Sequence, residues 1–376
     1  MHSAVYSTIF TAGLAALFCL TPAVRAQGPL TPPGAPAPTM KTLAQIEPRV
    51  AITNVPFTIT QPGSYYLTTN LATAGSGVIV QANRVTVDLM GFSLTGDNDE
   101  IGYGVWVSGQ PGAPWRDVTV RGGSIAGFSS GVFFEYAENG VVEGVAISGN
   151  VNHGVILYGA YGGPCSGNSV SGCAISGNGY TGVSMNGTQS GGLCNANTIS
   201  RCVIRGNGAS GISLNGGSEG RCWGNTIVDS TVSDNQNDGI MLNGFSGRCD
   251  GNRISRCSIS GNAVAGVRLS GSQGQVCGNW LENNLFCDNA DSGVRLEAVS
   301  ANRVQSNHIT GPTGANNYGI ISYATSAANL VVQNMCFGYQ YNYSLSTNDV
   351  NGPVVYAPNG LSTNGAAMSP WANFYR

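Results

Sequence analysis

The sequence predicts an all-β chain that winds into a parallel β-helix, a solenoid of about ten rungs with a cap at each end. The first observation is a glycine that recurs every 23 to 29 residues and is followed each time by Val or Ile. This glycine column consists of Gly77, Gly104, Gly131, Gly154, Gly182, Gly211, Gly239, Gly266, Gly293 and Gly319. A fixed period of this length is typical of a solenoid in which each repeat forms one turn.

The apolar spacing within each repeat indicates strands. Ile212 and Leu214 are separated by a single residue, as are Ile240 and Leu242, and this alternation is typical of half-buried strands. We expect three short strands per repeat, broken at Asn and Gly, with rungs stacked about 4.8 Å apart. Ten rungs would give a rod of roughly 45–50 Å.

An asparagine also recurs four residues before most of the column glycines. Its positions are Asn150, Asn178, Asn207, Asn235, Asn262 and Asn289. Stacked amides form hydrogen bonds from rung to rung, and Asn tolerates the left-handed conformation of tight turns. We expect these side chains to form one ladder along the rod.

The composition fits one elongated domain. Gly contributes 55 of 376 residues, and 42% of the residues are hydrophobic while only 9% are charged. The formal net charge of −3 indicates no particular partner. Lys41 is the single lysine, and no run of basic residues could follow a nucleic-acid backbone. We therefore expect no nucleic-acid partner, and the sequence does not determine the oligomeric state.

The first residues have the pattern of a secretory signal. An apolar run at 9–20 leads to Val24-Arg25-Ala26, a small-x-small cleavage site, so residues 1–26 are expected to be removed on export. We expect the mature protein to be secreted, extracellular or periplasmic, without a membrane span. The Pro-rich segment 27–49 is expected to be an extended tether.

The rest of the chain divides by repeat pattern. Residues 77–335 carry the β-helix repeats. Residues 50–76 precede them and are expected to cap the first rung, because an uncovered rung is a sheet edge that recruits other chains. Residues 336–376 mix Tyr, Pro and Trp and are expected to cap the other end.

Ten cysteines remain after removal of Cys19, and an even number in an exported chain favours disulfides. Our first hypothesis pairs cysteines within a rung: Cys165 with Cys173, Cys194 with Cys202, Cys249 with Cys257, and Cys277 with Cys287. Pairing between neighbouring rungs is the alternative, because the rung spacing lies within the Cα separation of a disulfide. A zinc site is disfavoured, since the sequence has no Cys-x-x-Cys.

The repeat Asn-x-Ile-x-x-Cys-x-Ile, followed by Asn and by Gly-Ile-x-Leu, resembles the right-handed parallel β-helix superfamily over about residues 70–335. The superfamily includes pectate lyases, polygalacturonases and uncharacterised secreted bacterial proteins. The resemblance implies a right-handed, single-stranded helix. It also implies a protein that binds or processes an extracellular polysaccharide or cell-surface glycan, for which an acidic chain is expected. The alternative is a non-enzymatic structural or adhesive rod.

The catalytic motifs of two subfamilies are missing. The chain has no Asp-Asp pair, and the nearest sequence to the Gly-His-Gly of polygalacturonases is Asn152-His153-Gly154. A lyase with a lysine base is disfavoured because Lys41 lies in the tether. A lyase that uses Arg and calcium stays open.

Several charged residues are candidates for catalysis or metal binding. The catalytic candidates are Asp234, Asp238, Arg205, Arg268 and Arg295. Asp97, Asp99 and Glu100 form the densest acidic cluster, and Ca²⁺ is the one cofactor that it would suit. The alternative for the aspartates is that they are solvated turn residues.

The strand opened by each column glycine has an outward position two residues later. On early rungs this position holds Trp106 and Phe133, and Tyr158 follows close by, so we expect an aromatic strip that stacks on sugars. On later rungs it holds Arg268 and Arg295, which could grip a uronate carboxylate. The alternatives are a covering loop for the aromatic residues and ion pairing with Glu297 for the arginines.

Overall fold

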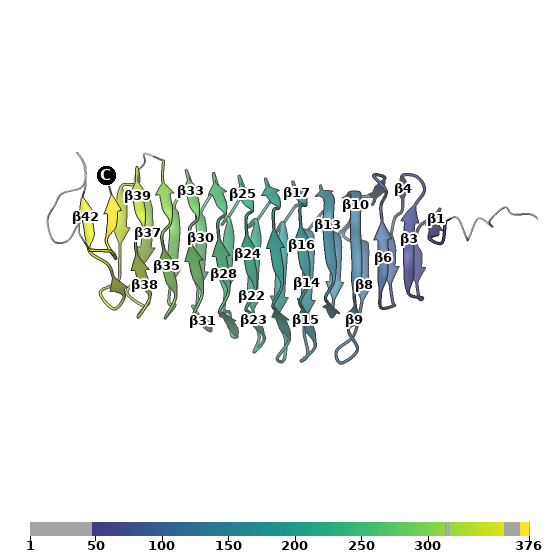
Figure 1. Ribbon diagram of the computed structural model, residues 1–376, viewed down its shortest axis with the longest axis horizontal. Coiled ribbons are helices and arrows are strands. Elements are labelled where there is room, and N and C mark those ends of the chain that lie inside the picture. Colours follow the sequence, from purple (N-terminus) through teal and green to yellow (C-terminus); the bar gives the residue numbers. More distant parts are fainter. Residues whose placement is uncertain (1–46, 313, 315, 357–368, 376) are drawn as a thin grey trace, which may run out of the picture. The chain divides into compact units, whose positions relative to one another are not determined.

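The structure is a computed structural model, and it describes residues 47–312, 314, 316–356 and 369–375. From Arg49 onward these residues form one compact unit, a rod of stacked rungs (Figure 1). The described residues form 43 β-strands, and none of them belongs to a helix long and apolar enough to cross a membrane. The expected signal at 1–26, and all of the tether except residues 47–49, lie outside the described residues.

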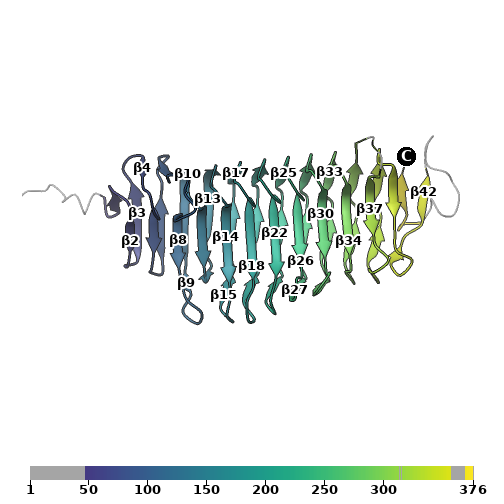
Figure 2. The same ribbon diagram turned by 180° about the vertical axis from the view of Figure 1, so that it is seen from behind.

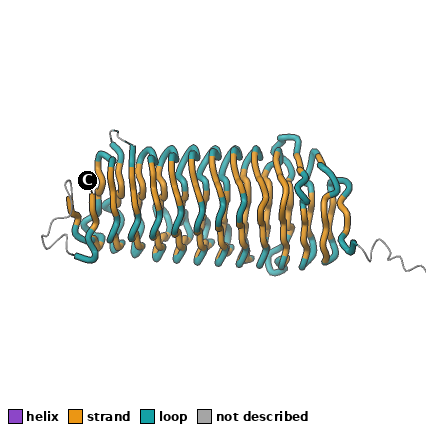
Figure 3. Tube along the Cα trace, turned by 45° about the horizontal axis from the view of Figure 1, so that its top comes forward, coloured by secondary structure: helices purple, strands orange, loops and turns teal. Residues whose placement is uncertain are grey.

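The rungs stack into three parallel sheets, and Figure 3 shows the chain coiling from one rung to the next. Sheet B takes one strand from each of twelve rungs and lies on the face seen in Figure 2. Its strands are β2 (Phe57–Ile59), β5 (Val78–Val80), β8 (Tyr103–Ser108), β11 (Ser130–Glu135), β14 (His153–Gly159), β18 (Val183–Gly187), β22 (Ile212–Gly216), β26 (Ile240–Asn243), β30 (Ala265–Ser270), β34 (Ser292–Glu297), β37 (Tyr318–Ser322) and β40 (Tyr341–Ser344).

Sheet A takes two strands from most rungs and lies on the face seen in Figure 1. Its strands are β1 (Val50–Ile52), β3 (Gly63–Leu67), β4 (Leu71–Ala72), β6 (Val85–Asp88), β7 (Ser93–Thr95), β10 (Val118–Ala126), β13 (Val141–Ser148), β16 (Ser169–Ser171), β17 (Ala174–Ser176), β20 (Thr198–Ser200), β21 (Val203–Arg205), β24 (Thr226–Val228), β25 (Thr231–Ser233), β28 (Arg253–Ser255), β29 (Ser258–Ser260), β32 (Trp280–Glu282), β33 (Leu285–Cys287), β35 (Arg303–Gln305), β36 (His308–Thr310), β38 (Leu330–Val332), β39 (Met335–Phe337), β41 (Val350–Asn351), β42 (Val354–Tyr356) and β43 (Asn373–Tyr375).

Sheet C is a third, smaller sheet that the three-strand repeat did not predict. Its strands are β9 (Trp115–Arg116), β12 (Ala137–Glu138), β15 (Pro164–Ser166), β19 (Leu193–Asn195), β23 (Arg221–Trp223), β27 (Arg248–Asp250) and β31 (Gln275–Cys277). A middle rung therefore has four strands. The difference arises because the buried apolar side chain of four of these strands is a cysteine, and the sequence pattern assigns three of these cysteines to disulfides and not to a strand core.

The core is a narrow column of stacked apolar side chains. Neighbouring rungs pair in register, so Ile175 lies beside Ile204 in sheet A and Met185 beside Leu214 in sheet B. All four side chains are fully buried. Each such side chain contributes roughly 1.5–3 kcal/mol relative to an exposed position.

Asparagine ladders line the turns, as predicted. From Asn150 to Asn289 each side-chain amide donates to the next asparagine along the column, at 2.8–2.9 Å. A second ladder runs from Asn168 through Asn225 to Asn329 and ends on Asp349. The amides are buried and satisfied, so the ladders hold the rungs in register.

The column glycine is required because adjacent rungs approach closely there. A Cβ at Gly239 would lie 2.6 Å from the carbonyl oxygen of Gly266 and 2.8 Å from Nδ2 of Asn262. Neither group can retreat, because the first is backbone of the next rung and the second belongs to the ladder. The recurring glycine therefore has a steric reason, and no left-handed φ is involved.

The within-rung disulfides gain no support, since all ten described cysteines are free thiols. Cys165 lies in sheet C, in register with Cys194 of the next rung, whereas Cys173 lies in the turn after β16. Cysteine neighbours thus follow one another along the rod, with Cys222 and Cys249 continuing the row. Burial raises the pKa of the Cys165 and Cys222 thiols, which keeps them protonated.

Candidate functional site

The side chains of sheet B form three rows along the rod, because rungs pair in register. Rows 2 and 3 are two residues apart and point outward, whereas row 1 precedes the column glycine and most of its members are buried. Row 1, just before the column glycine, holds Tyr103, Ser130, His153, Thr181, Ser210, Asp238, Ala265, Ser292 and Tyr318. Row 2, two residues after the glycine, holds Trp106, Phe133, Ile156, Ser184, Ser213, Met241, Arg268, Arg295 and Ile321. Row 3 holds Ser108, Glu135, Tyr158, Asn186, Asn215, Asn243, Ser270 and Glu297.

The early rungs form an aromatic cluster on this face. The ring of Tyr103 lies 5.5 Å from that of Trp106 and 4.7 Å from that of Phe133, and Phe133 meets Tyr158 at 6.0 Å. All four side chains are half-buried, so neither a covering loop nor full exposure describes them. The structure brings together the three predicted aromatic residues and adds Tyr103, which lies one row away.

Glu135 lies within the aromatic cluster. Its Oε2 accepts a hydrogen bond of 3.0 Å from the Trp106 indole nitrogen. Burial raises the pKa of the Glu135 carboxyl, and the bond from Trp106 partly opposes this rise. Burial and the Glu135 charge also raise the pKa of Tyr103. The cluster therefore combines flat apolar surface with one hydrogen-bonding carboxylate, although sequence reasoning did not select Glu135.

The middle rungs form a low polar floor. Ser184 and Ser213 are small and buried in row 2. The row 3 amides bond to one another and to these serines, with Asn215 Nδ2 at 2.8 Å from Asn186 Oδ1. The floor separates the aromatic cluster from the charged residues of later rungs.

The predicted arginine pair forms an ionic cluster, so the ion-pairing alternative is confirmed. Nη2 of Arg268 lies 2.8 Å from Oε2 of Glu297. Arg295 meets Oε1 of the same carboxylate at 2.5 Å and Oδ2 of Asp291 at 2.9 Å. Both guanidinium groups are thus already neutralised by carboxylates.

Asp238 is the buried member of this ionic cluster. Its side chain is fully buried, and Oδ1 accepts a hydrogen bond of 3.1 Å from the Ala265 amide. Oδ2 has no hydrogen-bond partner, and its nearest cation is Nη1 of Arg268 at 3.9 Å. Burial raises the pKa of Asp238 to about 6, although the Ala265 amide and Arg268 oppose the rise.

The other candidates do not join this face. Asp234 is exposed in a left-handed turn and accepts a bond from Ser233, and Arg205 is exposed on β21 of sheet A. Asp97 and Asp99 accept hydrogen bonds from backbone amides of their own loop, next to Glu100. Among the described residues no three Asp, Glu, His or Cys side chains gather as a metal site requires. Ca²⁺ therefore gains no support from this geometry.

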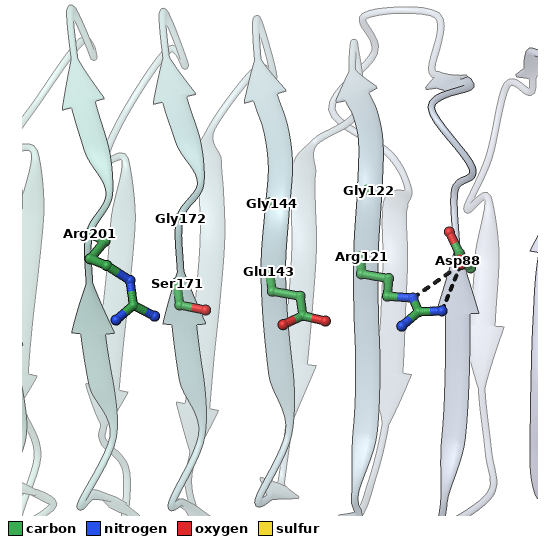
Figure 4. A pocket seen from close by; sticks show the side chains of 8 residues that line it. All are labelled: Asp88, Arg121, Gly122, Glu143, Gly144, Ser171, Gly172 and Arg201. Carbon is green, nitrogen blue, oxygen red and sulfur yellow. Dashed lines mark hydrogen bonds and ion pairs between the residues drawn. The ribbon is translucent and has the colours of Figure 1, made fainter.

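A shallow trough of about 450 Å³ lies on sheet A (Figure 4). It is lined by Asp88, Arg121, Gly122, Glu143, Gly144, Ser171, Gly172 and Arg201. The three glycines leave a corner bare on consecutive rungs, and a Cβ on Gly144 or Gly172 would meet no atom within 4 Å. Figure 4 shows Arg121 turned onto Asp88, which it contacts at 2.9 Å, so one of the two rim arginines is occupied.

Sequence reasoning also missed an exposed tryptophan on sheet A. Trp280 keeps 46% of its surface exposed and stands in register between Arg253 and Arg303. The guanidinium of Arg303 lies 5.3 Å from the indole centroid. The sequence signal that could have found it is its position directly after the repeat asparagine Asn279, where an outward row begins on successive rungs.

The family comparison agrees with the architecture. Residues 73–221, 164–337 and 219–367 match the sequence profile described as "Right handed beta helix region". These stretches overlap and together span most of the chain. No curated protein matches the sequence.

Solved structures share the fold. The A-module of the mannuronan C-5 epimerase AlgE4 of Azotobacter vinelandii aligns with a TM-score of 0.59 and 16% identity, over 81% of this chain and 88% of that one. The periplasmic alginate epimerase AlgG aligns with a TM-score of 0.51 and 13% identity, over 77% of each chain. A mutant tailspike of E. coli bacteriophage HK620, in complex with a pentasaccharide, aligns with a TM-score of 0.52 and 12% identity, over 81% of this chain and 57% of that one. At these identities the likeness shows the fold alone.

Proposed function

The chain belongs to the right-handed β-helix family, and on this basis we propose that it is a secreted protein that binds a polysaccharide along the outward face of sheet B. The observation that carries the proposal is the aromatic cluster of Tyr103, Trp106, Phe133 and Tyr158 around the Glu135 carboxylate. Half-exposed aromatic rings offer flat apolar surface to the C–H faces of sugar rings, and a carboxylate accepts bonds from their hydroxyl groups.

The rest of the face suits an extended chain. The floor continues from the aromatic cluster along the rod, and the half-buried amides of Asn186 and Asn215 offer hydrogen-bonding groups to sugar hydroxyls above the buried Ser184 and Ser213. From Trp106 to Arg295 the row crosses seven rung steps, or about 34 Å at 4.8 Å each. A sugar chain parallel to the rod axis would contact aromatic, amide and ionic groups in turn.

Relatives in fold support sugars as the ligand class. Two of the similar structures are named for epimerases of mannuronan and alginate, and a third holds a pentasaccharide. Export is part of the proposal: residues 1–26 have the pattern of a secretory signal, and AlgG is named as periplasmic.

We propose binding in preference to turnover because the catalytic candidates are dispersed or occupied. Asp234 and Arg205 lie off the face of sheet B. Asp238 is buried, and Arg268 and Arg295 are paired with carboxylates. Processing of the bound chain would require these pairs to open.

A polysaccharide screen tests the proposal. The purified protein is run by affinity electrophoresis through gels that contain pectate, alginate, chondroitin sulfate or a neutral glucan. We expect retardation by at least one polymer, and loss of at least tenfold in affinity in Trp106→Ala, since truncation of a Trp anchor in a binding surface typically costs about 2 kcal/mol or more.

Phe245→Ala is the matched control, because Phe245 is 50% exposed and lies outside the aromatic cluster. Its affinity should equal that of the unsubstituted protein. Lack of retardation by every polymer would overturn the proposal and leave the structural or adhesive rod as the account.

A further inference from the structure

Trp280 lies on the opposite face of the rod from the aromatic cluster. It opens β32, and its in-register neighbours on the flanking rungs are Arg253 in β28 and Arg303 in β35. We call these three residues the Trp280 patch. Such a row of Arg, Trp and Arg places one flat apolar ring between two cations along the rod axis.

The charges of the patch do not cancel. Arg253 pairs with Glu282, which neutralises one guanidinium. Arg303 contacts the uncharged Gln305 and has no carboxylate within 4 Å among the described residues. The three charged groups Arg253, Arg303 and Glu282 therefore sum to +1 on a chain of formal net charge −3.

The indole is held in place and still accessible. Arg303 stacks at 5.3 Å from the ring centroid, which restricts the ring without covering it, and 46% of Trp280 stays exposed. An exposed aromatic ring beside an uncompensated guanidinium fits a ligand that is flat and apolar on one side and anionic at its edge.

The row continues as a hydroxyl track. Ser169, Thr198 and Thr226 precede Arg253 in register, one per rung. All three side chains are half-buried, so their hydroxyl groups reach the surface. A repeating hydroxyl ligand would meet donors and acceptors at each rung before it reaches the patch.

We propose that the Trp280 patch is a second sugar-binding site, specific for a sugar residue that bears a carboxylate or sulfate. The indole packs against the sugar ring, and Arg303 binds the anionic group with Arg253 beside it. The proposal goes beyond binding on sheet B, where the arginines are paired with carboxylates. In this proposal the anionic group of the sugar is recognised on sheet A, by the arginines of the Trp280 patch.

Isothermal titration tests the proposal with three probes: a six-residue oligogalacturonate, a sulfated galactan oligomer of the same length, and neutral maltohexaose. We expect the anionic probes to bind, with affinity that falls as salt rises. Arg303→Gln should weaken anionic binding about tenfold through the lost hydrogen bond to the charged group, and Trp280→Ala should weaken it about tenfold through the lost packing of the indole against the sugar ring. Comparison of the two anionic probes tells whether carboxylate or sulfate is preferred.

Trp223→Ala is the matched control. Trp223 is also exposed, at 38%, and Arg221 also stacks on its ring at 4.9 Å, but Asp250 neutralises that arginine. Its anionic binding should be unchanged. Trp280→Phe keeps a ring and should retain most of the affinity, which separates loss of stacking from loss of fold.

The experiment distinguishes failure of the Trp280 patch from failure of the proposed site on sheet B. If anionic binding is insensitive to Trp280→Ala and Arg303→Gln but is lost in Trp106→Ala, the Trp280 patch is overturned and the sheet B proposal stands. If anionic binding is lost in Trp280→Ala and Arg303→Gln but unchanged in Trp106→Ala, the patch stands, and the sheet B proposal is decided by Trp106→Ala in the polysaccharide screen. Equal binding of maltohexaose and the anionic probes at Trp280 would also overturn the assignment of charge.

Discussion

Trp106 donates its indole N–H to Oε2 of Glu135 at 3.0 Å, although the two residues lie on neighbouring rungs and in different rows of sheet B. The bond is diagonal, since the in-register neighbour of Glu135 is Ser108. It orients the indole within the aromatic cluster and uses one of the two carboxylate oxygens of Glu135.

Trp106→Phe should raise the pKa of Glu135 further. The substitution keeps a ring but removes the donor whose bond lowers this pKa, so burial is left less opposed. A pH titration of the Glu135 carboxyl ¹³C resonance measures the change. Trp115→Phe is the control, because the Trp115 indole donates to the Ser108 carbonyl oxygen instead. An unchanged or lower pKa in Trp106→Phe contradicts the account.

Asp238 should make the protein less stable as pH rises from about 4 to about 6. Its pKa is raised from 3.8 to about 6 in the folded state, so over this range the folded chain keeps a proton that the unfolded chain releases. A difference of about two pKa units corresponds to about 3 kcal/mol. Chemical denaturation at several pH values should show this fall in the natural protein and a flatter profile in Asp238→Asn. Parallel profiles for the two proteins would argue against a raised pKa.

Asn225→Ala should destabilise the rod by about 3–5 kcal/mol. Asn225 donates to Asn252 and to the Cys194 carbonyl oxygen and accepts from Asn197, so the change leaves several buried groups without partners. Thermal and denaturant unfolding measure the loss. Asn243→Ala is the control on the outward face of β26 and should change stability by less than about 0.5 kcal/mol. Equal losses of unfolding free energy in Asn225→Ala and Asn243→Ala would show that the ladder does not stabilise the rod.

Gly239→Ala should cost about 2–3 kcal/mol through overpacking, because the added methyl group would clash with Gly266 and Asn262. Gly172→Asn should cost no more than about 1 kcal/mol, since its φ of +60° is one that Asn283 adopts at the same corner of a later rung and the space around its Cβ is open. The free energies of unfolding of Gly239→Ala and Gly172→Asn, each compared with that of the unsubstituted protein, measure the two costs. The reverse order would show that the rungs do not approach as closely as described.

Thiol labelling should distinguish two classes of cysteine. Cys277 and Cys287 are half-buried, whereas the other eight described cysteines are buried. Maleimide should therefore label these two in the native protein and all ten in denaturant, with Cys19 counted separately. Mass spectrometry after tryptic digestion assigns the labels. A native mass lower by two hydrogens per pair, with Cys165 linked to Cys194, would show instead that neighbouring rungs are cross-linked.

Much of the fold follows from the sequence because a solenoid repeats the same local physics. The column glycine and the ladder asparagine each occupy one place in every rung, so their spacing predicts stacking and register. Sheet C escaped prediction because the buried residue in strands such as Leu193–Asn195 is a cysteine, Cys194, which was assigned to a disulfide and not to the core. The cysteine pairing could not be derived, because the sequence period does not tell which neighbours within and between rungs face one another.

The site was predicted in part. Trp106, Phe133 and Tyr158 were found because they share one outward position or lie near it. The state of Arg268 and Arg295 depends on where Glu297 and Asp291 point, and side-chain direction at a strand end is set by tertiary packing. Trp280 was missed although it directly follows the repeat asparagine Asn279, because the residues of its row share no type and only register brings Arg253 and Arg303 beside it.

The most direct test of the central claim is hydroxyl-radical footprinting of the protein with and without a polysaccharide that it binds. The account predicts that Trp106, Phe133 and Tyr158 become protected from oxidation when the sugar chain is present. Tyr161 and Phe245, which are 59% and 50% exposed outside the aromatic cluster, should be oxidised equally in both states. Unchanged oxidation of the aromatic cluster, with protection elsewhere on the rod, would contradict binding along sheet B.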